Sequence, residues 1–302
     1  MKKYIVNILV FFAIVVVIDI CVGIVGDYLV GYVKSGDTKR TNDLAMLDQH
    51  DVLILGSSRA RHHYDAPFLS DTLGLDVYNA GYDGNGVVLA YGLLEMILER
   101  YQPKLIIYDV EPNFDINVYA EDNHHKRYIS RLKPYFRHKA VGDLIMDVSN
   151  EEWYKVHSGM MRYNMSILNM LTEGLRNSTD TNKGYSPLEG AYNREPSQVK
   201  NDFERDSFKI NYCRKLFLLA NENQIPIIVV ASPKYGMSSS DIIQPIKDLC
   251  ADQGILFLDY YSDAEFMTHK EWFKEPMHLN SIGARQFSVL IADKVSELLD
   301  IY

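Results

Sequence analysis

The sequence predicts a three-layer α/β/α domain that follows one membrane-spanning helix. Three observations lead to this fold class: five apolar runs of strand length, helical segments between them, and one long apolar run at the N-terminus. Continuous apolar runs indicate strands buried on both faces, as in a parallel sheet. Strands that alternate with helices are typical of a sheet covered by helices on both faces, with right-handed crossovers.

The N-terminal segment, residues 1–26, is predicted to be a short cytoplasmic end followed by a transmembrane signal anchor. Its apolar run extends from Tyr4 to about Val25, the length that a helix needs to cross a bilayer. The run is longer than the core of a signal peptide, and no small-x-small cleavage site follows it. We therefore expect a single-pass membrane protein that keeps its anchor.

The charges around the anchor predict its orientation. Lys2 and Lys3 precede the span, so the positive-inside rule places the C-terminal domain outside the cytoplasm, although three basic residues between 34 and 40 oppose this orientation. Asp19 lies within the span, where a carboxylate is costly. It indicates a function or a helix partner, unless it lies near enough to the outer end to reach water.

The chain after the anchor divides into a tether and one domain. Residues 27–50 are polar and mixed and are expected to form the tether, and residues 51–302 the domain. We expect a mainly parallel, flavodoxin-like sheet that binds ligands at the carboxyl ends of its strands. The predicted strands are residues 52–55, 75–79, 105–110, 225–232 and 255–260, and the predicted helices are 87–101, 206–223, 241–253 and 282–299.

Residues 114–205 interrupt the alternation of strands and helices. They are rich in Tyr, Asn, Lys and His, with weaker helical stretches near 137–148 and 160–175 and a loop-rich part at 177–198. So long an irregular connection in a compact domain usually has a function. We expect an insertion over the strand ends that acts as a lid or a substrate-recognition element.

The composition excludes one class of partner. The 302 residues carry a formal net charge of -9 and no run of Lys or Arg, which argues against nucleic-acid binding, because neutralising phosphates needs a basic face. After the anchor, only Cys213 and Cys250 remain, both in apolar helical patterns. One disulfide would fit, but two buried free thiols are favoured.

Two short segments carry residues suited to nucleophilic catalysis. The first is "LILGSSRA", in which Gly56 ends a predicted strand and Ser57 and Ser58 follow. A serine at this place is often only a helix cap, and the segment alone favours that interpretation. The second is "EPMHLN", in which Glu275 precedes His278 by three residues, so that the carboxylate can orient and stabilise the imidazole.

Two further segments follow predicted strands and offer hydrogen-bond donors. "NAGYDGNG" contains Gly84, and "PKLIIYDVEPNFD" contains Asn113. A glycine N–H and an asparagine side chain at these strand ends could hold a developing oxyanion beside Ser58, whereas each residue taken alone is an ordinary turn residue. The glycine spacing does not match the dinucleotide-binding fingerprint.

In this order, the four segments resemble the blocks of the SGNH (GDSL-type) hydrolase superfamily. That family is defined by a catalytic Ser, an oxyanion Gly, an oxyanion Asn and a catalytic His. The resemblance implies that Ser58 is the nucleophile and His278 the base, oriented by Glu275. Gly84 and Asn113 would then form the oxyanion hole together with the backbone N–H of Ser58. The implied chemistry is acyl transfer, and no cofactor is expected.

The chain departs from the family pattern at three places. Ser57 stands where the commonest first block, G-D-S, has its aspartate. Glu111 and Pro112 replace the usual Gly-x before the asparagine of the third block, and Glu275 replaces the usual Asp of the last block. The first change resembles some membrane-anchored branches of the superfamily.

Three charged residues near the predicted strand ends are further candidates for contact with substrate. Arg59 would guide an anionic substrate or lie in solvent on the first helix, and the second interpretation is favoured. Asp109 and Asp115 would contact substrate or be hydrogen-bonded structural residues, and again the second is favoured. The histidine pairs in "RARHH" and "HHKR" lack carboxylate or cysteine partners at defined spacing, so no metal is expected.

Two functions from different classes fit these observations. The first is a membrane-anchored serine esterase or O-acyltransferase, acting on an O-acyl or O-acetyl ester of a glycan or cell-envelope polymer, with a membrane acyl-transfer protein as a partner. The second is a catalytically degenerate domain of the same superfamily that binds a glycan or scaffolds an assembly outside the cytoplasm.

Overall fold

The computed structural model describes residues 1–302 except 119–124, 165, 176–179, 195–203 and 300–302. The chain forms two compact units. The first consists of residues 1–47 and 124–179, and the second of residues 48–123 and 180–302.

The second unit is built on a five-stranded parallel sheet. The strands have the order β2-β1-β3-β4-β5, and each pairs with its neighbour in the parallel sense. This arrangement confirms the predicted flavodoxin-like sheet. The bounds are β1 (Val52–Gly56), β2 (Val77–Asn79), β3 (Leu105–Asp109), β4 (Ile227–Ala231) and β5 (Leu256–Asp259).

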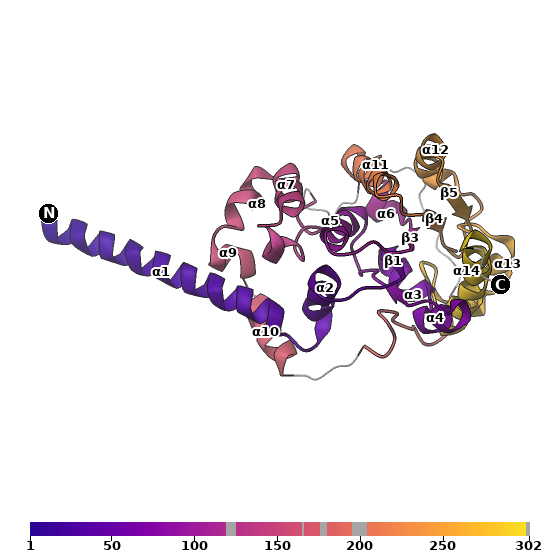
Figure 1. Ribbon diagram of the computed structural model, residues 1–302, viewed down its shortest axis with the longest axis horizontal. Helices are drawn as coiled ribbons and strands as arrows, with labels where there is room; N and C mark the ends of the chain where they lie inside the picture. The colour runs from indigo at the N-terminus through magenta and orange to yellow at the C-terminus, as the bar shows by residue number, and fades with distance from the viewer. Residues whose placement is uncertain (119–124, 165, 176–179, 195–203, 300–302) are drawn as a thin grey trace. The chain divides into compact units, whose positions relative to one another are not determined.

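Helices cover both faces of this sheet (Figure 1). On one face, α5 (Val87–Leu98), α11 (Ser207–Glu222) and α12 (Gln244–Gln253) pack side by side against the strands. On the other, α3 (Ser58–His63), α4 (Ala66–Leu73) and α14 (Ser281–Leu299) contact one another and strands β1 and β2. Burial between the two helical layers explains why β1, β3 and β4 are continuous apolar runs. Shorter elements of this unit are α6 (Pro112–Asp115), η2 (Asp241–Ile243), α13 (Ala264–Thr268), η3 (Lys270–Trp272), β6 (Phe273–Glu275) and β7 (His278–Leu279).

Two local features of this unit differ from the sequence prediction. Of the two outer strands of the sheet, β2 is fully buried, whereas β5 is only partly buried. Helix α4 was not predicted, since eight residues are too few to establish a helical period. Its ends are nevertheless well marked: the Asp65 side chain accepts from the Phe68 N–H, and Gly74 ends the helix in the left-handed conformation.

The first unit is entirely helical within its described residues. Its N-terminal helix α1 (Lys2–Tyr32) is long and apolar enough to cross a membrane, and most of its side chains are exposed. The remaining elements are α2 (Gly36–Met46), η1 (Lys133–Tyr135), α7 (Lys139–Val148), α8 (Asn150–Lys155), α9 (Gly159–Tyr163) and α10 (Ser166–Gly174). The predicted tether therefore contains the end of α1 and all of α2.

Asp19 of α1 has a partner helix. Its carboxylate accepts hydrogen bonds from the Ser158 hydroxyl at 2.6 Å and from the backbone N–H groups of Gly159 and Met160 at 3.1 and 2.9 Å. It therefore binds the unpaired N–H groups at the start of α9. A Cβ atom at Gly159 would lie 2.3 Å from the Gly23 nitrogen, so the two backbones touch. Of the interpretations of Asp19, the helix partner is the one that these contacts support.

The predicted insertion is shared between the two units. Residues 124–179 pack with the N-terminal helices, whereas residues 180–194 belong to the sheet unit. The placement of residues 124–179 over the strand ends stays a prediction. Both Cys213 and Cys250 are buried free thiols, as favoured from the sequence.

Candidate active site

The turn after β1 separates the two adjacent serines. Gly56 has φ +143°, and a Cβ atom there would lie 2.6 Å from the Asp109 carbonyl oxygen, so the position requires glycine. Ser57 is fully buried and caps α3 by accepting the Arg59 N–H at 3.2 Å. Ser58 is the first residue of α3 and is partly exposed. The cap interpretation thus applies to Ser57 and leaves Ser58 free for another role.

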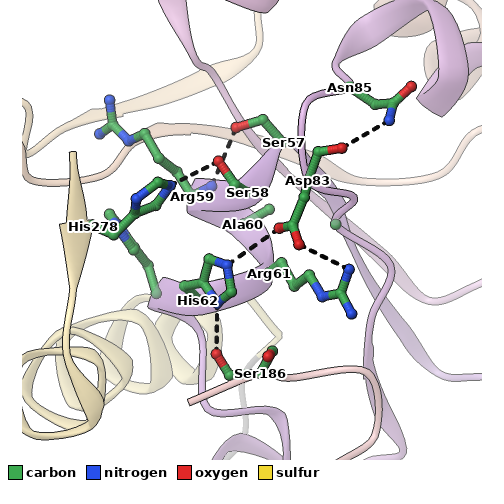
Figure 2. Close-up of polar contacts among 12 residues, drawn as sticks. Ser57, Ser58, Arg59, Ala60, Arg61, His62, Asp83, Asn85, Ser186 and His278 are labelled. Carbon is green, nitrogen blue, oxygen red and sulfur yellow. Dashed lines mark hydrogen bonds and ion pairs between the residues drawn. The ribbon is translucent and has the colours of Figure 1, made fainter. Parts of the chain in front are cut away.

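A short antiparallel hairpin, β6–β7, brings a histidine to Ser58. Glu275 and His278 are directly paired across this hairpin. The His278 Nε2 atom lies 2.7 Å from the Ser58 Oγ atom, and its Nδ1 atom is hydrogen-bonded to Glu275 Oε1 (Figure 2 shows the contact between Ser58 and His278). Ser58 and His278 are 220 residues apart in the sequence, and Glu275 and His278 are three residues apart. Together the three side chains form one continuous series of hydrogen bonds.

Two hydrogen bonds hold the Glu275 carboxylate, one on each oxygen. Its Oε2 atom accepts the Met277 N–H at 2.9 Å, while Oε1 binds His278. Partial burial alone would raise the pKa of Glu275, but these two hydrogen bonds hold this pKa below its usual value. An ionised carboxylate at this place stabilises the imidazolium that forms when His278 takes a proton.

The two predicted oxyanion residues lie on adjacent loops at the carboxyl ends of the strands: Gly84 follows β2 and Asn113 follows β3. Gly84 has φ +65°, which favours glycine at this turn. Two residues later, a Cβ atom at Gly86 would lie 2.7 Å from Phe114 Cβ, so this loop touches α6, which carries Asn113. The backbone of Asn113 is bound at both polar atoms, by Glu111 and Lys209, whereas its side-chain amide has no hydrogen-bond partner among the described residues.

Arg59 is not a substrate-binding residue, and it does not lie in solvent. Its side chain is 0% exposed. The guanidinium donates to Glu111 Oε2 at 3.2 Å and to Ser232 Oγ at 3.0 and 3.2 Å, and it lies over the Tyr261 ring. The predictions for Arg59 were wrong because the sequence does not show that Glu111 and Ser232, which follow the neighbouring strands β3 and β4, bury this side chain.

Asp109 and Asp115 are also fully buried, which excludes contact with substrate in this structure. Asp115 binds the N–H groups of Val87 and Glu111 at 2.8 and 2.7 Å and the Tyr108 hydroxyl at 2.7 Å, so it joins the starts of α5 and α6. Burial raises the pKa of Asp115 to about 7, against the lowering effect of these donors. Asp115 is thus a hydrogen-bonded structural residue, the interpretation favoured from the sequence. Asp109 is buried near Arg59, but its carboxylate oxygens have no hydrogen-bond partner among the described residues.

Two histidines that the sequence did not assign support the hairpin and the nucleophile. His63 Nε2 accepts the Leu279 N–H at 3.0 Å, so its proton lies on Nδ1 and is donated to Ser232 Oγ at 2.8 Å. Burial beside Arg59 keeps the pKa of His63 well below its usual value, in agreement with a neutral ring. His63 therefore fixes the residue after His278.

The neighbouring residue, His62, contacts the ring of His278. Its Nδ1 atom donates to the Ser186 carbonyl at 2.6 Å, and its Nε2 atom faces Asp83 at 3.2 Å. The rings of His62 and His278 meet edge to face at 5.3 Å (Figure 2). In the sequence, the only hint of these roles was the pair of adjacent histidines in "RARHH". The residues that His62 and His63 contact are distant in the sequence and could not be predicted from it.

Comparisons with known proteins do not assign this site. No protein-family model matches the chain, and no curated protein matches it. Among solved structures, it is similar to a protein described as a lipolytic protein of the G-D-S-L family from Desulfitobacterium hafniense DCB-2, with 11% identity and a TM-score of 0.39 over 80% of this chain and 98% of the other. It is also similar to a protein described as a platelet activating factor from Streptococcus pneumonia, with 11% identity and a TM-score of 0.42 over 91% and 98%. Because these values are low, the assignment of the site rests on its geometry.

Replacing Arg59 should destabilise the sheet unit strongly. Arg59→Met leaves the buried Glu111 without its ion-pair partner, and breaking a buried ion pair in this way costs about 3–5 kcal/mol. Denaturant unfolding of the full chain in detergent, followed by tryptophan fluorescence, should show this loss. The double variant Arg59→Met with Glu111→Gln should lose less than Arg59→Met alone, and an equal or larger loss would contradict the pairing.

The buried Asp109 predicts a pH-dependent stability. Burial raises the pKa of Asp109 from 3.8 to about 6, although Arg59 opposes the rise. Since the unfolded chain ionises first, the stabilisation from this group is complete below pH 4 and is lost as the pH rises through about 6. Asp109→Asn should therefore gain stability relative to wild type between pH 4 and 6.5, by at most about 1.4 kcal/mol per pH unit. A constant difference in unfolding free energy across this range would exclude the effect.

Proposed function

We propose that this protein is a serine-dependent hydrolase or acyltransferase that acts on an ester through an acyl-Ser58 intermediate. The observation that carries the proposal is the continuous chain from Ser58 Oγ through His278 to Glu275. A serine, an imidazole and a carboxylate in this order define a Ser-His-acid triad. In this proposal Ser58 is the nucleophile, His278 the base and Glu275 the orienting acid.

The first chemical step follows from these contacts. His278 Nε2, 2.7 Å from the Ser58 hydroxyl, takes its proton as Oγ attacks the ester carbonyl. The carbonyl π electrons move to oxygen, and the resulting oxyanion is held by the backbone N–H of Ser58, by Gly84 and by the free amide of Asn113. Glu275 stabilises the imidazolium, which then gives its proton to the leaving alcohol as the C–O bond breaks.

The second step releases the acyl group. His278 removes a proton from the acceptor, which is water in a hydrolase and a hydroxyl in an acyltransferase, as the acceptor oxygen attacks the acyl carbonyl carbon. The C–Oγ bond then breaks, and Ser58 Oγ takes the proton back from His278. We assign the substrate to O-acyl or O-acetyl esters of a glycan or cell-envelope polymer. The support is the apolar helix α1, which would anchor the sheet unit beside a membrane and place it outside the cytoplasm. A membrane acyl donor protein would be the partner of an acyltransferase.

The geometry favours an enzyme over the alternative of a degenerate, glycan-binding domain. A domain that only binds glycan has no need of a partly exposed serine hydrogen-bonded to a histidine whose other nitrogen faces an ionised carboxylate. Each of the three family departures is also compensated. Ser57 caps α3, Glu111 pairs with Arg59, and Glu275 reaches His278 across the hairpin.

Ser58→Ala should abolish covalent labelling by a serine-reactive fluorophosphonate, whereas Ser57→Ala should retain it. Only Ser58 faces His278, and loss of Ser57 removes a helix cap worth about 1 kcal/mol. Turnover of 4-nitrophenyl acetate by Ser58→Ala should fall by on the order of 10⁴-fold or more. The readouts are gel fluorescence and nitrophenolate release, with the full chain in detergent. Absence of labelling and turnover in the wild type between pH 6 and 9 would reject the enzyme and favour the binding domain.

Asn113→Ala should lower kcat by about a hundredfold and leave KM nearly unchanged, because an oxyanion donor acts mainly in the transition state. Asn223→Ala is the matched control, since Asn223 ends α11 at the opposite edge of the sheet and its amide binds only the Leu219 carbonyl. Steady-state kinetics on 4-nitrophenyl acetate measure both constants. Equal values for the two variants would remove Asn113 from the oxyanion hole.

A further inference from the structure

The end of β4 places a buried lysine beside the proposed catalytic residues. Lys234 is only 7% exposed. Its backbone N–H donates to the Tyr261 carbonyl at 3.1 Å, and the next N–H, that of Tyr235, donates to the Pro276 carbonyl at 2.9 Å. These two bonds hold the lysine between the end of β5 and the turn of the hairpin that carries the His–Glu pair.

The ammonium of Lys234 has no hydrogen-bond or ion-pair partner among the residues that the structure describes. The two carboxylates that attract it, Glu111 and Glu275, are engaged elsewhere. Glu111 binds Arg59, and Glu275 binds the catalytic imidazole and a backbone N–H. The nearest ring, that of Tyr261, has its centre 5.8 Å from Lys234 Nζ and accepts no hydrogen bond there.

The Lys234 side chain is mostly removed from water, but its Nζ atom keeps some contact with solvent. The hydration that the ammonium has lost is best replaced by a hydrogen-bonded acceptor of opposite charge. Burial lowers the pKa of Lys234, and Arg59 lowers it further, while the two glutamates oppose this shift. Among the described residues the Nζ atom therefore has no acceptor, yet a ligand can reach it from solvent.

We propose that Lys234 forms an anion-binding subsite of this active site, which binds a carboxylate or phosphate group on the ester substrate. The inference rests on the proposed function and narrows its substrate to esters that carry a negative charge near the scissile bond. The bound anion would supply the acceptor that Lys234 lacks and would form a charge-assisted hydrogen bond with it.

Support of Glu275 is the competing role for this lysine, and the contacts favour the subsite. Glu275 already accepts hydrogen bonds from His278 and from the Met277 N–H, one on each oxygen. Lys234 makes no direct ion pair with it. The chain also carries a net charge of -9, which disfavours the approach of anions, so a local cation is needed to bind an anionic ester.

The test compares anionic esters with neutral esters of similar shape, using the full chain in detergent. For the acyl side, the pair is 4-nitrophenyl hydrogen succinate and 4-nitrophenyl butyrate. For the alcohol side, it is 4-acetoxybenzoate and phenyl acetate. The measured quantity is the ratio of kcat/KM for the anionic ester to that for the neutral one. In at least one pair, Lys234→Met should lower this ratio by about tenfold or more, as expected for a lost charge-assisted hydrogen bond.

Two further variants complete the comparison. Lys234→Arg keeps the charge and should recover most of the ratio. Lys104→Met makes the same chemical change at the opposite edge of the sheet, where Lys104 pairs with Asp51, and should leave the ratio at the wild-type value. An equal effect of Lys234→Met on anionic and neutral esters would overturn the subsite and assign the lysine to Glu275.

A thermal measurement keeps the subsite testable without turnover. Acetate or inorganic phosphate should raise the Tm of the wild type and of Lys104→Met, but not that of Lys234→Met, and comparison of the two anions separates a carboxylate from a phosphate site. If no ester is turned over but this Lys234-dependent shift is present, the proposed enzyme fails and the anion site stands. If esters are turned over but the ratio and the Tm do not depend on Lys234, the subsite fails and the enzyme stands.

Discussion

The buried guanidinium of Arg59 is the contact on which the candidate active site depends. It lies directly after the proposed nucleophile and binds Glu111, beyond the end of β3, and Ser232, beyond the end of β4. One side chain therefore ties together the carboxyl ends of three neighbouring strands. Because these bonds are fully buried, their geometry is stiff, and it fixes where α3 begins and where Ser58 faces.

The same short helix organises the other half of the site. Beyond Arg59, its histidines reach in two directions: His63 binds the backbone of the hairpin, and His62 binds residues 83 and 186. The hairpin needs this support, since a two-stranded ribbon is marginal by itself. Its register then sets the pairing of Glu275 with His278, which brings the longer side chain of a glutamate within hydrogen-bond reach of the imidazole.

The N-terminal unit shows how a polar residue is accommodated in an apolar helix. Asp19 binds the start of α9 through three donors, and the close contact between Gly23 and Gly159 allows the two backbones to meet. The carboxylate is thereby solvated by protein rather than by water. If α1 anchors the chain in a membrane, these contacts make part of the 124–179 segment a support for the anchor, a role different from the lid expected for the insertion.

The sequence by itself determined the five strands of the sheet, four of the helices that cover it, the long apolar N-terminal segment and the four short segments that carry Ser58, Gly84, Asn113 and His278. These features are local: apolar periodicity reports which faces are buried, and turn residues mark where strands end. Only the tertiary structure decided the roles of Arg59, Asp109 and Asp115, which are buried although their residue types suggest exposure. It also decided the partners of His62 and His63, because those partners lie between about 20 and more than 200 residues away in the sequence. Such contacts depend on the register of the sheet, which brings the carboxyl ends of neighbouring strands together. No local pattern in the sequence encodes which residues meet there.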